Sequence, residues 1–240
     1  MEGADLVAAG LAAGHRPQVV FVHAARALEL SARLGLSGQD EPPPGAAGAP
    51  PPAVHPVAER VAAKISSLET PPDVMAVFPL PERRALTTLS GREGVVPAGL
   101  LVVFADGLGD PGNMATAPGS ADLYGPKTVR AGMGAVFELP LFPEVRLADV
   151  LAALPGAAVY GLAAHEGTPL AAAGLRRPAV LVVGAERSGL SGEALAHVTD
   201  LVTIPLAPGL PGAVESLNAG VAGAIALYEF SRRPAAPAKG

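Results

Sequence analysis

Two segments in the last third of the chain combine residue types that can hold a ligand through the backbone. In the first, an apolar run ends at Gly184, and Glu186 and Gly189 follow it in a glycine-rich loop. Glycine lets a backbone approach a ligand closely and permits turns that side chains block. In the second, the apolar run through Ile204 is cut by Pro205, which cannot donate to a strand ladder and leaves backbone groups available. These patterns indicate loops that bind a cofactor at strand ends.

A third segment places short polar residues where a helix is expected to begin. Ser216, Leu217 and Asn218 lie in the first turn of a long helical pattern, and the first N–H groups of a helix have no partner within it. We therefore expect free N–H groups and small polar side chains beside the two strand ends. The pattern also predicts a buried stripe on this helix, formed by Leu217, Val221, Ile225 and Tyr228.

The elements that must position these segments alternate between strand and helix. Apolar runs predict strands at 99–106, 157–164, 179–186 and 200–206, and helical spacing predicts helices at 127–140, 145–154, 192–198 and 214–233. This order predicts an α/β fold with a mostly parallel sheet covered on both faces. Ligands then belong at the carboxyl ends of the strands.

The first 82 residues predict a separate small α/β domain. Its elements are helices at 3–13, 27–36 and 56–68 and strands at 17–23 and 74–81. Between them, residues 37–56 are mostly Pro, Gly and Ala with almost nothing to bury, so we expect a disordered or extended loop without a structural element. A polar linker at 83–97 would lead into the second domain, residues 98–234.

Other chemistries are less well supported by the residues. Gly107, Gly109 and Gly112 have the spacing of a dinucleotide fingerprint, but Pro118 and Gly119 cut short the helix that must receive the pyrophosphate. The acidic residue expected about 20 positions further on is also missing. We therefore reject a nicotinamide-dependent enzyme.

No nucleophile or metal site stands out either. The segment 189–192 lacks the G-x-S-x-G pattern of a nucleophile elbow. The five histidines have no ligand spacing, and the absence of cysteine excludes disulfides and thiolate metal sites. We expect no metal, and the lack of cysteine is typical of a cytoplasmic protein.

Composition narrows the class of partner. No apolar run reaches about 18 residues, so no membrane span is expected, and Glu2 stands where an export signal would be basic. The net charge is −5, so any face that binds nucleic acid must be local. The available basic clusters are Arg83 with Arg84 and Arg92, Arg176 with Arg177, and Arg232 with Arg233.

The motifs together resemble those of one family. G-x-E-x-x-G-L at 184–190, I-P-L at 204–206 and E-S-L-N at 215–218 are similar to the second and third signature motifs of SpoU-type, or TrmH-like, RNA ribose 2′-O-methyltransferases of the trefoil-knotted SPOUT superfamily. D-P-G-N at 110–113 matches the start of the first motif, and 118–140 resembles the segment that follows it. Residues 1–82 are similar to the family's L30e-like RNA-binding domain.

This resemblance implies a function for the second domain. It implies a knotted domain that binds S-adenosylmethionine, acts as a homodimer and methylates a 2′-hydroxyl of ribosomal or transfer RNA. By motif position, the residues that contact the cofactor would be Gly184, Ile204 and Leu217. The active-site positions would be Asn113, Glu186, Ser216 and Asn218.

The chain departs from the family pattern in the first motif. Ala115 stands at the position of the motif glycine, and Gly119 stands at the position of an arginine that helps to activate the hydroxyl. The helix and strand that normally follow are missing after Ala117, and residues 210–213 look like a small insertion. A catalytically impaired, RNA-binding relative therefore stands as the alternative to an active enzyme.

Overall fold

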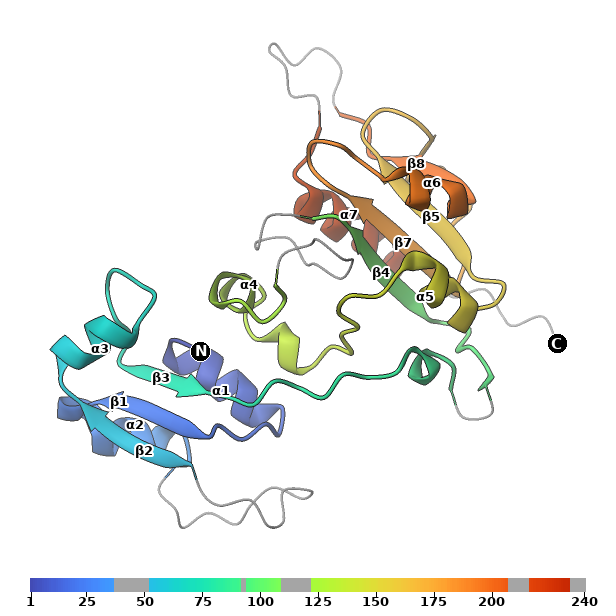
Figure 1. Ribbon diagram of the computed structural model, residues 1–240. Helices are drawn as coiled ribbons and strands as arrows, with labels where there is room; N and C mark the ends of the chain where they lie inside the picture. The colour runs from blue at the N-terminus through green and yellow to red at the C-terminus, as the bar shows by residue number, and fades with distance from the viewer. Residues whose placement is uncertain (37–51, 92–93, 109–121, 207–215, 234–240) are drawn as a thin grey trace. The chain divides into compact units, whose positions relative to one another are not determined.

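The chain forms two compact units, which are described separately. The computed structural model describes residues 1–36, 52–91, 94–108, 122–206 and 216–233 (Figure 1). The first unit comprises Met1–Glu82 with Tyr124–Pro140, and the second comprises Arg83–Leu123 with Leu141–Gly240. The sequence pattern assigns 124–140 to the second domain, whereas these residues pack with the first unit.

The first unit is a three-stranded sheet whose strands alternate with helices along the chain. Its main elements are α1 (Ala4–Ala12), β1 (Val19–His23), α2 (Ala27–Arg33), β2 (Ala53–Val57), α3 (Glu59–Ile65) and β3 (Val74–Val77). The strand order is β2-β1-β3, with β2 parallel and β3 antiparallel to β1. Val7 of α1 and Leu30 of α2 pack in one buried cluster with Val20 and Val22 of β1, so both helices cover the same face of this sheet.

One strand is absent from the sequence-based prediction. Residues 53–57 form β2, although 37–56 was expected to contain no element. The strand gave no signal because it lies at the edge of the sheet and none of its residues is fully buried. Pro56 is tolerated there because an edge strand needs no N–H on its open side. Residues 37–51 lie outside the described part of the chain.

The helix predicted over 127–140 is interrupted. It comprises α4 (Pro126–Ala131) and a short 3-10 turn, η4 (Ala135–Phe137). Between them Met133 and Gly134 have φ angles of 48° and 89°, which a helix cannot accommodate. A side chain at Gly134 would come within 2.7 Å of the Ala9 Cβ. The break lets Phe137 pack against Phe78, with ring centroids 5.3 Å apart.

The second unit is a five-stranded parallel sheet; the parallel arrangement was predicted, whereas the short strand at 168–169 was not. Its strands, in the spatial order β4-β7-β5-β8-β6, are β4 (Leu101–Asp106), β5 (Ala158–Ala163), β6 (Thr168–Pro169), β7 (Ala179–Gly184) and β8 (Asp200–Thr203). The helices are α5 (Leu147–Ala153), α6 (Gly192–His197) and α7 (Ala219–Arg232), with a 3-10 turn η2 (Leu86–Leu89). All the strand pairs are parallel.

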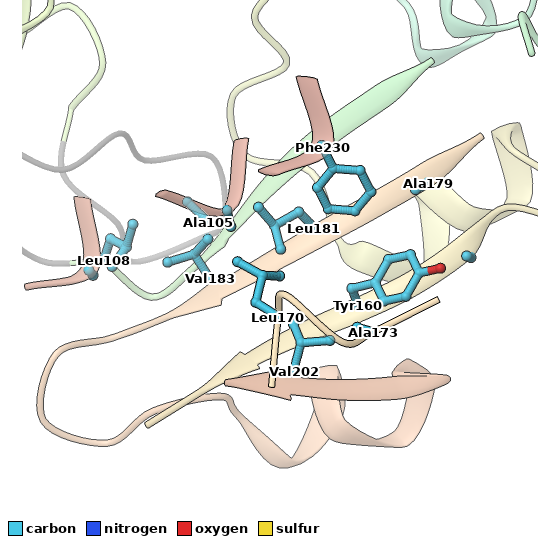
Figure 2. Close-up of a cluster of buried hydrophobic side chains, with 13 residues drawn as sticks. Ala105, Leu108, Tyr160, Leu170, Ala173, Ala179, Leu181, Val183, Val202 and Phe230 are labelled. Atoms are coloured by element: carbon cyan, nitrogen blue, oxygen red, sulfur yellow. The ribbon is translucent and has the colours of Figure 1, made fainter. Parts of the chain in front are cut away.

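Strand β7 forms the centre of this unit. All six of its residues are buried, between β4 and β5. Leu181 and Val183 face a cluster that includes α7, which Figure 2 shows in close-up. Val180 and Val182 belong to the opposite cluster, which contains residues of α5 and α6. Helices therefore cover both faces of the sheet, which explains the uninterrupted apolar run in the sequence.

The predicted buried stripe on α7 is wrong. Val221, Ile225 and Tyr228 are 50%, 39% and 65% exposed. The buried positions are instead Ala219, Gly223, Ala226 and Phe230. Small residues let the helix lie close to the sheet: a Cβ at Gly223 would meet a Val183 methyl at 3.8 Å. Apolar spacing alone did not distinguish the two faces, because both carry apolar residues.

The carboxyl end of α7 is anchored by charged side chains. Arg233 bonds to Glu229 at 2.8 Å and to the carbonyls of Ala171, at 2.8 Å, and Ala173. Arg177 donates to the carbonyl of Phe230 at 2.8 Å. Because hydrogen bonds from Arg233 and then from Arg232 favour the carboxylate, the pKa of Glu229 lies below its ordinary value.

Replacing Glu229 with Gln should destabilise the fold near neutral pH and have a smaller effect in acid. A depressed folded-state pKa contributes stability above the unfolded-state pKa, and this contribution is lost as the pH falls through the folded-state value. The difference in urea midpoint between wild type and variant should therefore shrink from about pH 7 to about pH 3. The matched Glu166→Gln, on an exposed side chain, should show no such trend. A pH-independent difference for Glu229→Gln would contradict the assignment.

Candidate functional site

A pocket lies at the carboxyl ends of the parallel strands in the second unit. Its volume is about 330 Å³, and it is lined by the ends of β5 and β7, by residues that follow β8, and by the start of α7. Ligand pockets in proteins range from about 300 to 1,000 Å³, so the space suits a small molecule. This is where parallel α/β sheets place their ligands.

The end of β7 forms one wall of the pocket and has no room for a side chain. A Cβ on Gly184 would lie 2.3 Å from the carbonyl carbon of Gly189. Residues 185–189 form a closed loop, in which the N–H of Ala185 donates to the carbonyl of Gly189 at 3.0 Å and the reverse bond is 2.9 Å. Gly189 has a φ of 67°, which favours glycine. The loop therefore lies directly against the end of β7, and its residues line the pocket.

The loop is also held from its far side. The Asp106 carboxylate, at the end of β4, accepts a hydrogen bond from the backbone N–H of Ser191 at 2.6 Å. The Ser191 hydroxyl in turn accepts from the N–H of Ala194 at 3.1 Å and caps α6. The glycine-rich loop is thus fixed between β7 and a capped helix.

The segment after β8 and the start of α7 complete the pocket. Ile204 and Leu206 line it, just beyond the last residue of the strand. The Thr203 hydroxyl donates to the carbonyl of Ala164 at 3.2 Å, which ties this strand end to that of β5. Asn218 caps α7, because its side-chain oxygen accepts from the N–H groups of Gly220 at 3.0 Å and of Val221 at 3.2 Å.

The structure brings most of the predicted site residues together. Gly184, Ile204 and Leu217 line the same pocket, and so do Glu186 and Ser216. Asn218 does not line the pocket. It lies next to Leu217, and its side-chain oxygen caps α7. Asn113 lies outside the described residues. The chemical roles of all these residues stay predictions.

Some pocket residues were missed by sequence reasoning. His165, from the connection after β5, and Arg187 and Ser188, from the glycine-rich loop, also line the pocket. The spacing of the histidines in the sequence did not fit a metal site, so His165 and the other histidines were given no role. Its position directly after a strand of a parallel sheet was the available signal, because such positions gather at the ligand edge.

Among the residues described, no group of three or more His, Asp or Glu side chains is placed to hold a metal ion. None of the helices described is both long and apolar enough to cross a membrane.

The chain is similar in sequence to a known family of RNA-modifying enzymes. The family model described as "SpoU rRNA Methylase family" matches residues 104–228. The 23S rRNA (guanosine(2553)-2′-O)-methyltransferase RlmP of Bacillus subtilis is 30% identical over 192 residues, which cover 72% of this chain and 71% of RlmP. Across several curated relatives, the chain spans between 38% and 71% of their length.

Solved structures show the same fold. A TrmH-family protein from Porphyromonas gingivalis is 31% identical, with a TM-score of 0.72, over 98% of this chain and 89% of that one. The SpoU methyltransferase AviRb from Streptomyces viridochromogenes, solved in complex with AdoMet, is 23% identical, with a TM-score of 0.76, over 97% and 88%. The predicted α/β class is confirmed. The trefoil knot and the L30e-like character of residues 1–82 stay predictions.

Replacing Gly184 with Ala should destabilise the second unit. The added methyl group would meet backbone atoms of Gly189 and Leu190 within 2.5 Å, and overpacking of this kind costs about 1–3 kcal/mol. Urea unfolding would measure the loss. Gly192→Ala is the matched control, because a Cβ at this exposed first residue of α6 has nothing within 4 Å, and its stability should be unchanged or slightly higher. Equal stability of Gly184→Ala and wild type would contradict the tight loop.

Proposed function

Because the chain belongs to the SpoU rRNA methylase family, we propose that it transfers a methyl group from S-adenosylmethionine to a ribose 2′-hydroxyl of ribosomal or transfer RNA. The observation that carries this proposal is the convergence of four separate segments on one pocket: the ends of β5 and β7, the residues after β8 and the start of α7. The relatives' names support the substrate class, since RlmP is named as a 23S rRNA 2′-O-methyltransferase.

The residues of the pocket fit S-adenosylmethionine. Gly184 lets the loop 185–189 lie directly against the end of β7, and apolar side chains such as Leu162 and Ile204 offer a surface for an adenine ring. Backbone N–H and carbonyl groups at strand ends and loops can bond the polar atoms of the cofactor. When bound, the cofactor supplies the methyl group on a positively charged sulfur. AviRb, which shares this fold, was solved in complex with the same cofactor.

The chain's own residues would bind the cofactor and orient the RNA hydroxyl. Gly184, Ile204 and Leu217 would contact the cofactor, largely through their backbone. Glu186 and Ser216 line the same pocket with polar side chains, so they can contact the reacting hydroxyl or the cofactor's charged end. A ribose hydroxyl is a poor nucleophile, so its position relative to the methyl group is the main contribution a protein can make.

Two more residues have supporting roles in the proposal. Asn218 would act by holding the start of α7, and with it Ser216 and Leu217, in place through its cap. Asn113 is proposed as an active-site residue on its motif position alone. The same first motif has Gly119 where the family has arginine, and this departure motivates the alternative of a catalytically impaired relative.

Cofactor binding and methyl transfer to RNA can be measured one after the other. Calorimetric titration with S-adenosylmethionine should show saturable binding, and labelled methyl groups should then pass to unmodified 23S rRNA transcribed in vitro. Methylation of a 2′-hydroxyl makes the adjacent phosphodiester resistant to alkali, which identifies the position of the group. Absence of cofactor binding would overturn the enzyme assignment. Cofactor binding without transfer to either ribosomal or transfer RNA would favour the impaired relative.

The proposal includes a homodimer in the cytoplasm. Its support is an apolar patch on α7, formed by the exposed side chains of Val221, Ile225 and Tyr228, which share one face of the helix by their spacing. Apolar patches of this kind on a helix mark protein interfaces. The cytoplasmic location is supported by the substrate class, since ribosomal and transfer RNA are found there.

A charge in the apolar patch should disrupt the dimer. Ile225→Glu places a carboxylate that would lose its water at the interface, which costs several kcal/mol, and sedimentation should report a monomer. Leu28→Glu makes the same change on a side chain that is 91% exposed in the first unit, and it should leave the dimer intact. A wild-type protein that sediments as a monomer at micromolar concentration would rule out this part of the proposal.

A further inference from the structure

Arg187 lines the pocket with a positive charge, and no contact among the described residues gives this side chain a structural role. Its side chain is exposed and lines the pocket. Within the described residues its guanidinium forms no hydrogen bond or ion pair. By contrast, Arg177 and Arg233 bond to backbone carbonyls and hold α7 in place. An arginine with a structural role would show such contacts, so Arg187 is available to a ligand.

The loop that carries Arg187 is held in shape. Residue 187 is the middle residue of the loop 185–189, which is closed by the paired hydrogen bonds between Ala185 and Gly189. The bond from Ser191 to the Asp106 carboxylate fixes the chain just beyond it. A charge held on such a loop loses little conformational entropy of the backbone when it binds.

The chemistry of the proposed acceptor requires an anion near this pocket. In RNA the carbon that bears the 2′-hydroxyl is bonded to the carbon that bears the 3′-phosphate. A hydroxyl brought to a methyl group in the pocket therefore carries a phosphate with it. The protein has a net charge of −5, and Glu186 adds a carboxylate to the same wall. Among the described residues that line the pocket, Arg187 is the only Lys or Arg.

We propose that Arg187 binds the phosphate on the 3′ side of the target ribose and so positions the 2′-hydroxyl at the pocket. This inference rests on the proposed function and deepens it by naming an RNA-positioning residue. The guanidinium presents a planar fork of donors that matches two phosphate oxygens. The carboxylate of the cofactor is the other source of anionic oxygens, and the test separates the two.

The test compares Arg187→Gln and Arg187→Lys with a control that removes the same charge elsewhere. Arg176→Gln is suitable, because its exposed side chain bonds to the carbonyl of Gly156 before β5, at the opposite end of the strands from the pocket. For each protein, calorimetry measures the affinity for S-adenosylmethionine. Filter binding to in vitro transcribed 23S rRNA over a range of salt concentrations measures the phosphate contacts, and methyl transfer gives KM for the RNA and kcat.

Arg187→Gln should weaken RNA binding about tenfold at low salt and lower the slope of log affinity against log salt by about 0.7–0.9. KM for the RNA should rise more than kcat falls, while cofactor affinity stays within about twofold of wild type. Arg187→Lys should restore the salt slope, since it restores the charge. Arg176→Gln should behave like wild type.

Two outcomes would overturn the inference. If Arg187→Gln loses affinity for S-adenosylmethionine and keeps the salt slope of RNA binding, Arg187 binds the cofactor carboxylate. If the variant matches wild type in every measurement, Arg187 contacts neither ligand, and the proposed function still stands because the wild-type protein transfers methyl groups. Failure of the wild type itself to bind cofactor would remove the proposed function and the inference with it.

Discussion

The close approach of the backbone at Gly184 and Gly189 is the constraint on which the pocket depends. Strand β7 is buried along its whole length, so its carboxyl end has to leave the core and turn at once. A Cβ at Gly184 would lie 2.4 Å from the carbonyl oxygen of Gly189, so only glycine lets the loop fold back on the strand. This loop forms one wall of the pocket, and the ends of β5 and β8 and the start of α7 line the rest.

Much of this arrangement could be predicted because it follows from local rules. The apolar run of β7 and the glycines after it predicted a strand that ends in a ligand loop, and the segment from 214 predicted a helix, which begins at Ala219 with Asn218 as its cap. The two strand ends and the helix meet because carboxyl ends of parallel strands share one edge. The sequence also predicted which family the chain belongs to, through short motifs whose spacing the fold then explains.

The features that could not be predicted from the sequence are those that depend on which surfaces pack together in the fold. Both faces of α7 carry apolar residues, and small side chains at Gly223 and Ala226 decide which face lies against the sheet, because they allow closer approach. The larger residues of the predicted stripe were left exposed in consequence. Strand β2 gave no periodic signal because it is an edge strand with little buried surface. His165 lines the pocket because the topology of the sheet brings the end of β5 there, and Arg187 lies in the predicted ligand loop but had been given no role.

We propose that the pocket at the carboxyl ends of the strands in the second unit holds S-adenosylmethionine. Backbone amide chemical shifts, recorded while the cofactor is titrated into the labelled protein, test it most directly. If the cofactor occupies this pocket, the largest changes at saturation occur at residues 184–189, 204, 206 and 216–219, where the pocket is lined or bordered. Saturable binding with its largest changes elsewhere, for example around Gly107 after β4, would contradict it.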